Sequence, residues 1–337
     1  MSAALPLLVV STGCPSGIGP EVSVAAAAKL KRAATVLLGD EATLRKAATL
    51  VGVAQKRLLR WDGQARDASA IYFAQVGEPL SDRDRVPGKP NARAGEAQLE
   101  YIEAAFTLVK SSSNAALVTG PVSKAAIAHS GLARARRFLG HTEWLQELDG
   151  AKTSVMCFVC DKLATSLVTT HVPLANVPRA VKSAGVAAAT VELARLLQKL
   201  GKKRPRLAVA SLNPHAGESE LLGGEEARAI APGIALAKKA LGRGAELSGP
   251  VGAETAYRKA AHGGFDGVVA MYHDQATIPM KLLAFGDAVN VTAGLSIVRT
   301  SVDHGTAYDI AWRGHADAGG MLAALELGRR ILTGQSA

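Results

Sequence analysis

The sequence predicts an α/β fold built on a mostly parallel sheet. Short apolar runs alternate with longer stretches of helical pattern along the chain, which is the order expected of β-α-β units. Aromatic residues make up only 4% of the 337 residues, whereas 34 residues are glycine, and small side chains let helices pack closely on a sheet. The length corresponds to one large or two medium domains.

The expected strands are short runs rich in Val, Leu or Ala that are bounded by turn signals. In the first half of the chain they are Leu7–Ser11, Thr35–Leu38, Ile71–Gln75 and Ala115–Val118. The helices expected between them are an Ala-rich stretch that reaches about Arg32, then Glu41–Val51 and Ala94–Ser111. The segment 81–91, rich in Pro, Gly and charge, is expected to be a loop.

A glycine-rich turn connects the first strand to the first helix, with the sequence Thr12-Gly-Cys-Pro-Ser-Gly-Ile-Gly-Pro-Glu21. Backbone N–H groups at the N-terminus of a helix favour anions, so this turn is a candidate anion site. Its spacing differs from the G-x-G-x-x-G fingerprint of dinucleotide-binding folds. A similar turn into a helix, Thr119-Gly-Pro-Val-Ser-Lys124, follows the fourth expected strand.

Three apolar runs in the second half of the chain each lead into a histidine. They are Leu163–Thr170 before His171, Arg206–Leu212 before His215, and Gly267–Tyr272 before His273. The carboxyl ends of parallel strands lie along one edge of a sheet, where such sheets bind ligands, so the three imidazoles can converge. Three neutral imidazoles with open coordination positions are typical of a catalytic divalent-metal site.

The formal net charge of +10 raises the question of nucleic-acid binding. The basic residues are dispersed and no stacking aromatics lie between them, which argues against nucleic acid and favours a small anionic substrate. No apolar run reaches the roughly 20 residues that a membrane span needs, and no secretory leader is recognisable. We therefore expect a cytoplasmic protein that binds neither membrane nor nucleic acid.

The chain has three cysteines, Cys14, Cys157 and Cys160. The last two form a C-x-x-C pattern, which is found in redox and zinc sites. They lie within an expected strand, Ser154–Cys160, where residues three apart point to opposite faces, so core packing is expected. Cys14 lies at the N-terminus of a helix, which favours a thiolate, but its expected role is to fill a tight turn with a small side chain.

Seven short motifs occur in order along nearly the whole chain. They are Gly17-Ile-Gly-Pro-Glu21, Thr119-Gly-Pro-Val-Ser-Lys124, Gly140-His-Thr-Glu143, Thr169-Thr-His-Val-Pro173, Asn213-Pro-His-Ala-Gly-Glu218, Met271-Tyr-His-Asp-Gln275 and Arg299-Thr-Ser-Val-Asp-His-Gly-Thr306. Several of them are long and chemically unusual. Together they resemble the 4-hydroxythreonine-4-phosphate dehydrogenase (PdxA) family of pyridoxal phosphate biosynthesis.

The resemblance implies a fold like those of isocitrate and isopropylmalate dehydrogenases, with helices on both faces of the sheet and the site in a cleft between two subdomains. The expected subdomains are residues 1–125 with 290–337, and residues 126–289, which carry the metal histidines. The resemblance also implies a homodimer whose active sites are shared, with one metal ligand donated across the interface.

The resemblance implies roles for individual residues as well. His171, His215 and His273 match the family's metal ligands, for which Zn, Mg and Co are candidates. The residues that match its substrate-binding positions are His141, Thr142, Lys281, Asn290 and Arg299. The residues that match its cofactor loop, expected to bind NAD or alternatively NADP, are Asp303, His304, Gly305, Thr306, Ala307 and Asp309. The general base stays open between Lys281, Asp274 and a metal-bound water.

The chain departs from the family pattern at a few positions. Cys14 stands where the first loop usually has an acidic residue, and Ala276 stands where glycine usually follows His273-Asp-Gln275. The expected metal and phosphate ligands are intact. These differences leave the identity of the substrate open among phosphorylated hydroxy acids.

The implied reaction is the NAD-dependent oxidation of 4-phosphooxy-L-threonine to 2-amino-3-oxo-4-phosphooxybutanoate, which decarboxylates to 3-amino-2-oxopropyl phosphate. A divalent metal would act as a Lewis acid. One alternative is a dehydrogenase of phosphorylated erythronate or threonate. Another is a phosphate-acyltransferase-like protein, which would need no set of three imidazoles. An inactive binding module would tolerate Cys14 but would not need His171, His215 and His273.

Overall fold

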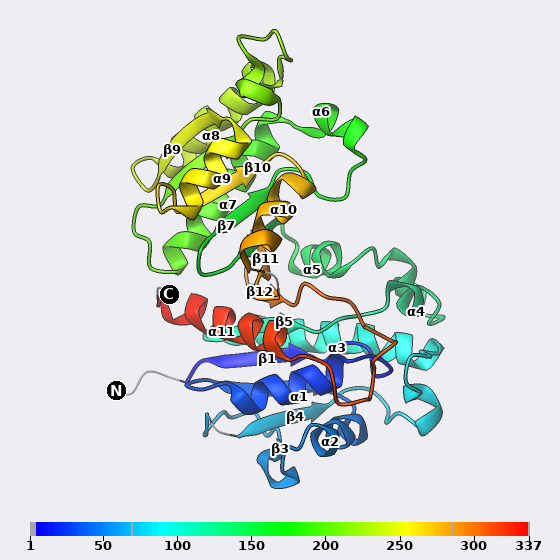
Figure 1. The fold of residues 1–337 in the computed structure, drawn as a ribbon. Coiled ribbons are helices and arrows are strands. Elements are labelled where there is room, and N and C mark those ends of the chain that lie inside the picture. The colour runs from blue at the N-terminus through cyan, green and yellow to red at the C-terminus, as the bar shows by residue number, and fades with distance from the viewer. Residues whose placement is uncertain (1–4, 69, 285, 336–337) are drawn as a thin grey trace. The chain divides into compact units, whose positions relative to one another are not determined.

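A computed structural model describes residues 5–68, 70–284 and 286–335, and the chain forms two compact units (Figure 1). The first unit comprises the residues up to Lys152 together with Leu295–Thr333. The second comprises Thr153–Gly294 and the C-terminal residues from Gly334. The chain therefore leaves the first unit after Lys152, returns to it at Leu295 and leaves it again after Thr333.

The first unit is built on a parallel sheet. Its strands are β1 (Leu7–Ser11), β2 (Ala34–Gly39), β3 (Leu58–Arg60), β4 (Ile71–Gln75), β5 (Ala115–Thr119) and β12 (Val298–Ser301). They lie in the order β3-β4-β2-β1-β5-β12, and each neighbouring pair is parallel. All of β1 is buried, as expected for a central strand covered on both faces. The returning segment adds β12 beside β5, which aligns Arg299 with Leu117.

Helices cover both faces of this sheet. They are α1 (Gly19–Lys29), α2 (Glu41–Leu50), α3 (Ala92–Lys110), α4 (Lys124–Ala128), α5 (His141–Asp149) and α11 (Gly319–Thr333). Alternate strand residues point to opposite faces. Leu7 and Val9 belong to the same core as the apolar side of α3. On the other face a Cβ added to Gly328 of α11 would lie 3.0 Å from Leu8, so glycine lets this helix approach the sheet.

Three of these helices begin at a side-chain cap. Asp40 accepts the N–H of Thr43 at 2.8 Å at the start of α2, and Asn91 accepts the N–H of Ala94 at 2.9 Å at the start of α3. Ser123 accepts the N–H of Ala126 at 3.1 Å at the start of α4. Such caps satisfy N–H groups that the helix itself leaves unbonded.

The second unit has a mixed sheet in which parallel pairs predominate. Its strands are β6 (Val155–Val159), β7 (Ala164–Leu167), β8 (Arg206–Ala210), β9 (Glu246–Val251), β10 (Gly267–Ala270) and β11 (Val289–Ala293). They lie in the order β11-β6-β7-β10-β8-β9. β6 is antiparallel to both of its neighbours, whereas β7, β10, β8 and β9 are parallel to one another in turn. The expected mostly parallel α/β fold class is confirmed.

Helices cover both faces of the second sheet too. The longer ones are α7 (Ser183–Lys199), α8 (Ala231–Leu241), α9 (Ala253–Ala261) and α10 (His273–Ala284), and α6 (Val177–Ala180) is short. α9 and α10 share a core with β7, β8 and β10. On the opposite face Leu193 and Leu197 of α7 lie against Gly267 of β10. None of the helices in the described ranges is long and apolar enough to cross a bilayer.

The segment 126–152 packs with the first unit. Its apolar residues Ile127, Phe138, Trp144 and Leu145 join the core formed with α3. The breaks between the units therefore fall after Lys152 and after Gly294, whereas the sequence placed them after residues 125 and 289. This difference matters for the site, because it puts His141 in the same unit as Arg299.

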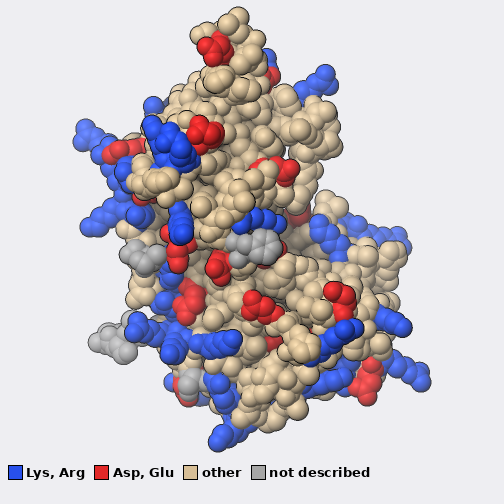
Figure 2. All heavy atoms as spheres, viewed as in Figure 1, with Lys and Arg blue, Asp and Glu red and all other residues tan. Residues whose placement is uncertain are grey.

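The basic residues are spread over the surface. On the face shown in Figure 2, Lys and Arg side chains are interspersed with Asp and Glu. Several basic residues of the chain form ion pairs, such as Arg134 with Glu103 and Arg206 with Asp266. The dispersal expected from the sequence is visible on this face.

Candidate active site

Three neighbouring parallel strands of the second unit carry the predicted metal histidines. β7 pairs with β10, and β10 pairs with β8, both in parallel. His171 follows β7, His273 begins α10 directly after β10, and His215 lies in η5 (Pro214–Gly217), which follows β8. The predicted placement of these histidines at one edge of a parallel sheet is therefore found in the structure.

Two of the three imidazoles lie close together. The ring centroids of His171 and His273 are 5.8 Å apart, with the ring planes inclined at 41°. Nδ1 of His273 is hydrogen-bonded to Oδ1 of Asp274 at 2.7 Å. A carboxylate bound to one ring nitrogen fixes the orientation of the imidazole and leaves Nε2 for another ligand, which is the usual arrangement around histidine-bound metals.

His215 lies on a loop of unusual backbone conformation. Its φ is 51°, and the residues from Ala216 to Glu220 also have positive φ. Such left-handed runs of non-glycine residues are rare and concentrate at functional sites. Within the described part of the chain, no three His, Cys, Asp or Glu side chains are grouped closely enough to hold a metal. The structure thus pairs His171 with His273 but does not group all three predicted ligands within the described part of one chain.

A buried carboxylate anchors the loop that carries His215. Oε1 of Glu226 accepts the N–H groups of Leu212 and Asn213 at 2.9 and 2.8 Å. Oε2 of Glu226 accepts Nδ2 of Asn213 at 3.0 Å. Glu226 comes from a single π-helical turn, η6 (Glu226–Ile230), which precedes α8. In the sequence it resembles any surface glutamate, so its role could not be predicted.

Arg299 is a cation built into the interior of the first unit. It lies in β12, and only 3% of its surface is exposed. Nη2 and Nε of its guanidinium donate to Oγ1 of Thr119 in β5 at 2.6 and 3.2 Å. Burial lowers the pKa of Arg299 to about 10, and the negative charge of Glu143 opposes this change. The side chain therefore stays charged at neutral pH.

His141, the first residue of α5, lies near this cation. Its Nε2 is buried and has no hydrogen-bond partner among the described residues. The ring meets that of Phe138 edge to face, with 6.1 Å between centroids. Burial, together with the charges of Arg299 and Lys124, lowers the pKa of His141 well below the ordinary 6.5. His141 is therefore neutral at pH 7 and offers a ring nitrogen to a ligand.

The N-terminus of α5 has no capping side chain. Gly140 occupies the N-cap position, where α2, α3 and α4 have Asp, Asn or Ser. The N–H groups of the first turn, which includes Thr142, are therefore left without a side-chain acceptor. Uncapped helix N-termini favour anions. His141, Thr142 and Arg299, three of the predicted substrate residues, thus lie in one unit around an environment suited to an anion.

The other two predicted substrate residues, Lys281 and Asn290, belong to the second unit. Lys281 is exposed in the last turn of α10, the helix that begins at His273. Asn290 lies in β11, and its Oδ1 is buried without a hydrogen-bond partner in the described part of the chain. Both therefore share a unit with the predicted metal histidines.

The predicted cofactor loop lies against the first glycine-rich turn. The N–H of Ile18 donates to the carbonyl of Thr306 at 3.0 Å. A Cβ on Gly17 would come within 2.9 Å of the same oxygen, so glycine is needed for this approach. The buried carboxylate of Glu21 accepts the N–H groups of Trp312 and Gly314. The glycine-rich turn thus contacts one side of the loop. On the loop Asp303, His304, Gly305 and Asp309 are exposed.

Cys14 is buried in the turn behind this loop. Its Sγ lies 3.4 Å from Oη of Tyr308, and burial raises the pKa of the thiol. Because burial raises the pKa more than the hydrogen bonds with Tyr308, Ser16 and Gly17 lower it, Cys14 is a packed thiol and not a thiolate. Tyr308 also borders a pocket of about 370 Å³. The residues lining that pocket are Pro90, Asn91, Ala92, Ser123, Ala125, Ala126, His129 and Tyr308.

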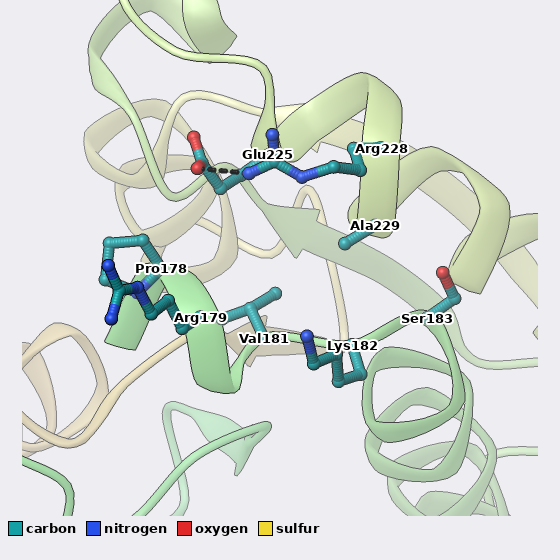
Figure 3. A pocket seen from close by; sticks show the side chains of 8 residues that line it. All are labelled: Pro178, Arg179, Val181, Lys182, Ser183, Glu225, Arg228 and Ala229. Carbon is teal, nitrogen blue, oxygen red and sulfur yellow. Dashed lines mark hydrogen bonds and ion pairs between the residues drawn. The ribbon is translucent and has the colours of Figure 1, made fainter. Parts of the chain in front are cut away.

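A larger pocket of about 480 Å³ lies in the second unit (Figure 3). Figure 3 shows Glu225 and Arg228, which form an ion pair, on one side and the end of α6 on the other. The residues lining it are Pro178, Arg179, Val181, Lys182, Ser183, Glu225, Arg228 and Ala229. None of the predicted metal, substrate or cofactor residues is among them.

Three residues near the predicted site received no individual role from the sequence. Thr119 and Lys124 belong to one of the motifs, and Glu143 belongs to another. Thr119 holds Arg299, and the charges of Lys124 and Glu143 act on His141 and Arg299 respectively. The motifs pointed to these segments, but only the fold shows which side chains meet.

The chain is similar to proteins of one family in both sequence and structure. The sequence model of the family described as "Pyridoxal phosphate biosynthetic protein PdxA" matches residues 31–328. A 4-hydroxythreonine-4-phosphate dehydrogenase from Geobacter metallireducens is 39% identical over 327 residues, covering 95% of this chain and 94% of that protein. A D-threonate 4-phosphate dehydrogenase from Salmonella typhimurium is 36% identical over 329 residues, covering 96% of this chain and 98% of that protein.

Among solved structures, a 4-hydroxythreonine-4-phosphate dehydrogenase from Klebsiella pneumoniae superimposes with a TM-score of 0.84 at 36% sequence identity. The match covers 97% of this chain and 99% of that one. The family model and these relatives extend over nearly the whole chain, so the family suggested by the motifs is confirmed. The chain is a member of the PdxA family of pyridoxal phosphate biosynthetic proteins.

Proposed function

We propose that the protein is an NAD-dependent, metal-requiring dehydrogenase that oxidises 4-phosphooxy-L-threonine to 2-amino-3-oxo-4-phosphooxybutanoate. That product decarboxylates to 3-amino-2-oxopropyl phosphate, a step of pyridoxal 5'-phosphate (vitamin B6) biosynthesis. The observation that carries the proposal is the pair formed by His171 and His273 at the ends of adjacent parallel strands. The names of the relatives, which are dehydrogenases of phosphorylated hydroxy acids, support it.

The donor set of the second unit fits a divalent metal. His171 and His273 would hold it from one chain, with Asp274 orienting His273. His215, which forms no three-residue group with them in the described part of the chain, would come from the second subunit of a homodimer. Imidazole ligands suit Zn²⁺ or Co²⁺ better than Mg²⁺, which prefers oxygen. When bound, such an ion supplies a Lewis acid for the oxidation of the alcohol and the loss of CO₂.

The substrate residues of this chain would bind its polar groups. Arg299 stays charged and is fixed by Thr119, so it can bind an anionic group without reorganising. Neutral His141 and the N–H groups at the start of α5 can donate to the same group. Lys281 and Asn290 are the other two proposed substrate-binding residues, and Oδ1 of Asn290 is buried without a hydrogen-bond partner among the described residues.

NAD would bind on the exposed side of the loop Asp303–Asp309. Within this loop the carbonyl of Thr306 accepts the N–H of Ile18, and Glu21 holds the segment that follows it through Trp312 and Gly314, so this part of the backbone is anchored before a cofactor arrives. The general base stays open between Lys281 and Asp274. The hydrogen bond between Asp274 and His273 gives Asp274 an orienting role. If Asp274 is also the general base, it has to accept the substrate's proton while it keeps this role.

A second candidate substrate is a phosphorylated sugar acid that lacks the amine, such as D-threonate 4-phosphate. Relatives with that name are about as similar to this chain as those named for the amino acid: one from Cupriavidus necator is 38% identical over 340 residues. Both substrates present the same alcohol, carboxylate and phosphate. The residues described above could bind these shared groups in either acid, so the two acids differ for the site only where one has an amine and the other a hydroxyl.

The test is to compare the two acids directly. The purified enzyme, loaded with Zn²⁺ or Co²⁺, is given each acid with NAD, and kcat/KM is measured from NADH absorbance. We expect NADH and CO₂ in equal amounts, with the higher kcat/KM for 4-phosphooxy-L-threonine. A higher kcat/KM for D-threonate 4-phosphate would overturn the first assignment in favour of the second. No NADH from either acid would overturn both.

A further inference from the structure

Lys124 is a cation of the first unit to which neither the sequence nor the family resemblance assigns a role. It is the first residue of α4 and its side chain is exposed. Within the described ranges no carboxylate lies close enough to form an ion pair with it. Its Nζ is 3.4 Å from the position that a Cβ on Gly140 would occupy, so the ammonium lies at the start of α5.

Gly140 makes room for this ammonium. Its φ of 168° is extended backbone that any residue adopts, so the backbone conformation does not require glycine. A Cβ there would, however, lie 2.9 Å from Oε2 of Glu143 and 3.4 Å from Nζ of Lys124. The missing side chain at the N-cap thus leaves the helix uncapped and also gives space to two charged groups.

The groups around Lys124 are arranged to bind an anion. Arg299 is buried and charged, and Nε2 of His141 is buried without a partner among the described residues. The charge of Lys124 acts on His141 together with that of Arg299. Glu143 is the acidic residue of this cluster, and its charge acts on Arg299. Two cations face one carboxylate and one neutral imidazole, so the cluster keeps a net positive charge.

We propose that Lys124 is a further substrate-binding residue, which holds the phosphate group of the substrate together with Arg299 at the N-terminus of α5. This inference rests on the proposed oxidation of a phosphorylated hydroxy acid. A phosphate ester carries a charge of about −1.5 to −2 at pH 7 and three acceptor oxygens. Two cations, an imidazole and free backbone N–H groups match it better than they match a carboxylate with a single charge.

Lys124→Ala and Lys124→Arg test this role, with Lys56→Ala as the matched control. Lys56 is an exposed lysine of the same unit that lies away from α5, in η1 (Gln55–Arg57). For each variant, kcat and KM are measured with 4-phosphooxy-L-threonine and with 4-hydroxy-L-threonine, which lacks the phosphate. The affinity for inorganic phosphate is measured separately by calorimetry.

We expect Lys124→Ala to raise KM for the phosphorylated acid about ten- to a hundredfold, the effect of losing one charge-assisted hydrogen bond. Its kcat, and its kcat/KM for the unphosphorylated acid, should change little. Affinity for inorganic phosphate should fall in parallel with the rise in KM. Lys124→Arg should recover most of the loss because it keeps the charge, and Lys56→Ala should behave like the parent.

Equal losses for the two acids, or an unchanged KM in Lys124→Ala, would overturn the assignment of Lys124 to the phosphate. The phosphate titration separates this from a failure of the proposed reaction. If the parent enzyme oxidises neither acid, weaker phosphate binding by Lys124→Ala still supports the anion site. Unchanged phosphate binding by that variant overturns the site whatever the reaction is.

Discussion

His171 and His273 lie with their ring centroids 5.8 Å apart at the ends of the neighbouring strands β7 and β10. His215 follows β8, the other neighbour of β10. The backbone of its loop has positive φ angles, the left-handed conformation, from His215 to Glu220. In the described part of one chain His171 and His273 form a pair, and no third His, Cys, Asp or Glu completes a metal-binding group with them. This arrangement is the one expected if, as proposed, each metal takes two ligands from one subunit and one from another.

Asp274→Asn tests whether Asp274 orients a metal ligand. The asparagine oxygen accepts the Nδ1 hydrogen bond more weakly than a carboxylate, so His273 becomes a poorer and less well fixed ligand. We expect metal affinity to fall about 10- to 100-fold, measured by zinc titration against a chelator. Asp287→Asn, at an exposed aspartate of the same unit, should bind metal like the parent. Suppose instead that metal affinity is unchanged and that kcat no longer rises with pH as it does in the parent. That result would identify Asp274 as the general base.

His141 predicts a pH dependence of stability. Its pKa is lowered in the folded protein by burial and by Arg299 and Lys124. Below the ordinary value of 6.5, the unfolded chain therefore takes up a proton that the folded protein does not, and stability falls as the pH falls. The slope from this residue approaches about 1.4 kcal/mol per pH unit.

The measurement is urea unfolding between about pH 7 and 5. In His141→Gln the slope of the unfolding free energy against pH should decrease by an amount that corresponds to the uptake of up to about one proton. His262→Gln, at an exposed histidine, should keep the slope of the parent. An unchanged slope in His141→Gln would contradict the assignment of a neutral, buried imidazole.

Much of the site's framework could be predicted from the sequence, because apolar runs followed by histidine identify the ends of buried parallel strands. β7, β8 and β10 occur where those runs predicted them. Which imidazoles meet depends on the loops beyond the strands, and the loop of His215 is shaped by Glu226, a buried carboxylate that the sequence does not distinguish. Pattern alone could not predict that contact.

The position of His141 illustrates a second limit. The sequence grouped it with the metal histidines because no composition change marks a break near residue 152. In the structure, Phe138 and Trp144 pack into the core of the first unit, and this places His141 with Arg299. Contacts between residues so far apart along the chain are not encoded in any local pattern.

Arg299→Ala is expected to lower kcat/KM for the phosphorylated acid about ten- to a hundredfold, because one charge-assisted contact is lost. Arg299→Lys should recover only part of this, since it keeps the charge but lacks the planar fork that bonds Thr119. Initial rates at varied acid and varied NAD separate the two binding steps. KM for NAD should change little, and an equal rise in both KM values would contradict the assignment of Arg299 to the acid.

Cys14→Ser should keep a near-normal kcat. The thiol is buried against Tyr308 and its pKa is raised, so it is poorly suited to act as a nucleophile or a base. In the folded protein Cys14 should also resist iodoacetamide at neutral pH, whereas the partly exposed Cys160 serves as the reactive comparison in mass spectrometry. A fall in kcat of several orders of magnitude would show that Cys14 takes part in the reaction.

Subunit mixing tests the shared metal site and the proposed oxidation together. His171→Ala, His215→Ala and His273→Ala should each be inactive as pure homodimers, because each removes one metal ligand. In a mixed dimer of His215→Ala and His273→Ala subunits, one site receives an intact His171–His273 pair from the first subunit and an intact His215 from the second. In a mixed dimer of His171→Ala and His273→Ala subunits, both pairs are broken.

The deciding measurement is the rate of NADH formation from 4-phosphooxy-L-threonine after subunit exchange. We expect the mixture of His215→Ala with His273→Ala to regain a substantial part of the parent activity and the mixture of His171→Ala with His273→Ala to stay inactive. Recovery in the second mixture and none in the first would contradict the pairing of His171 with His273 as ligands from one chain. Sedimentation of the parent protein as a monomer would contradict the shared site altogether.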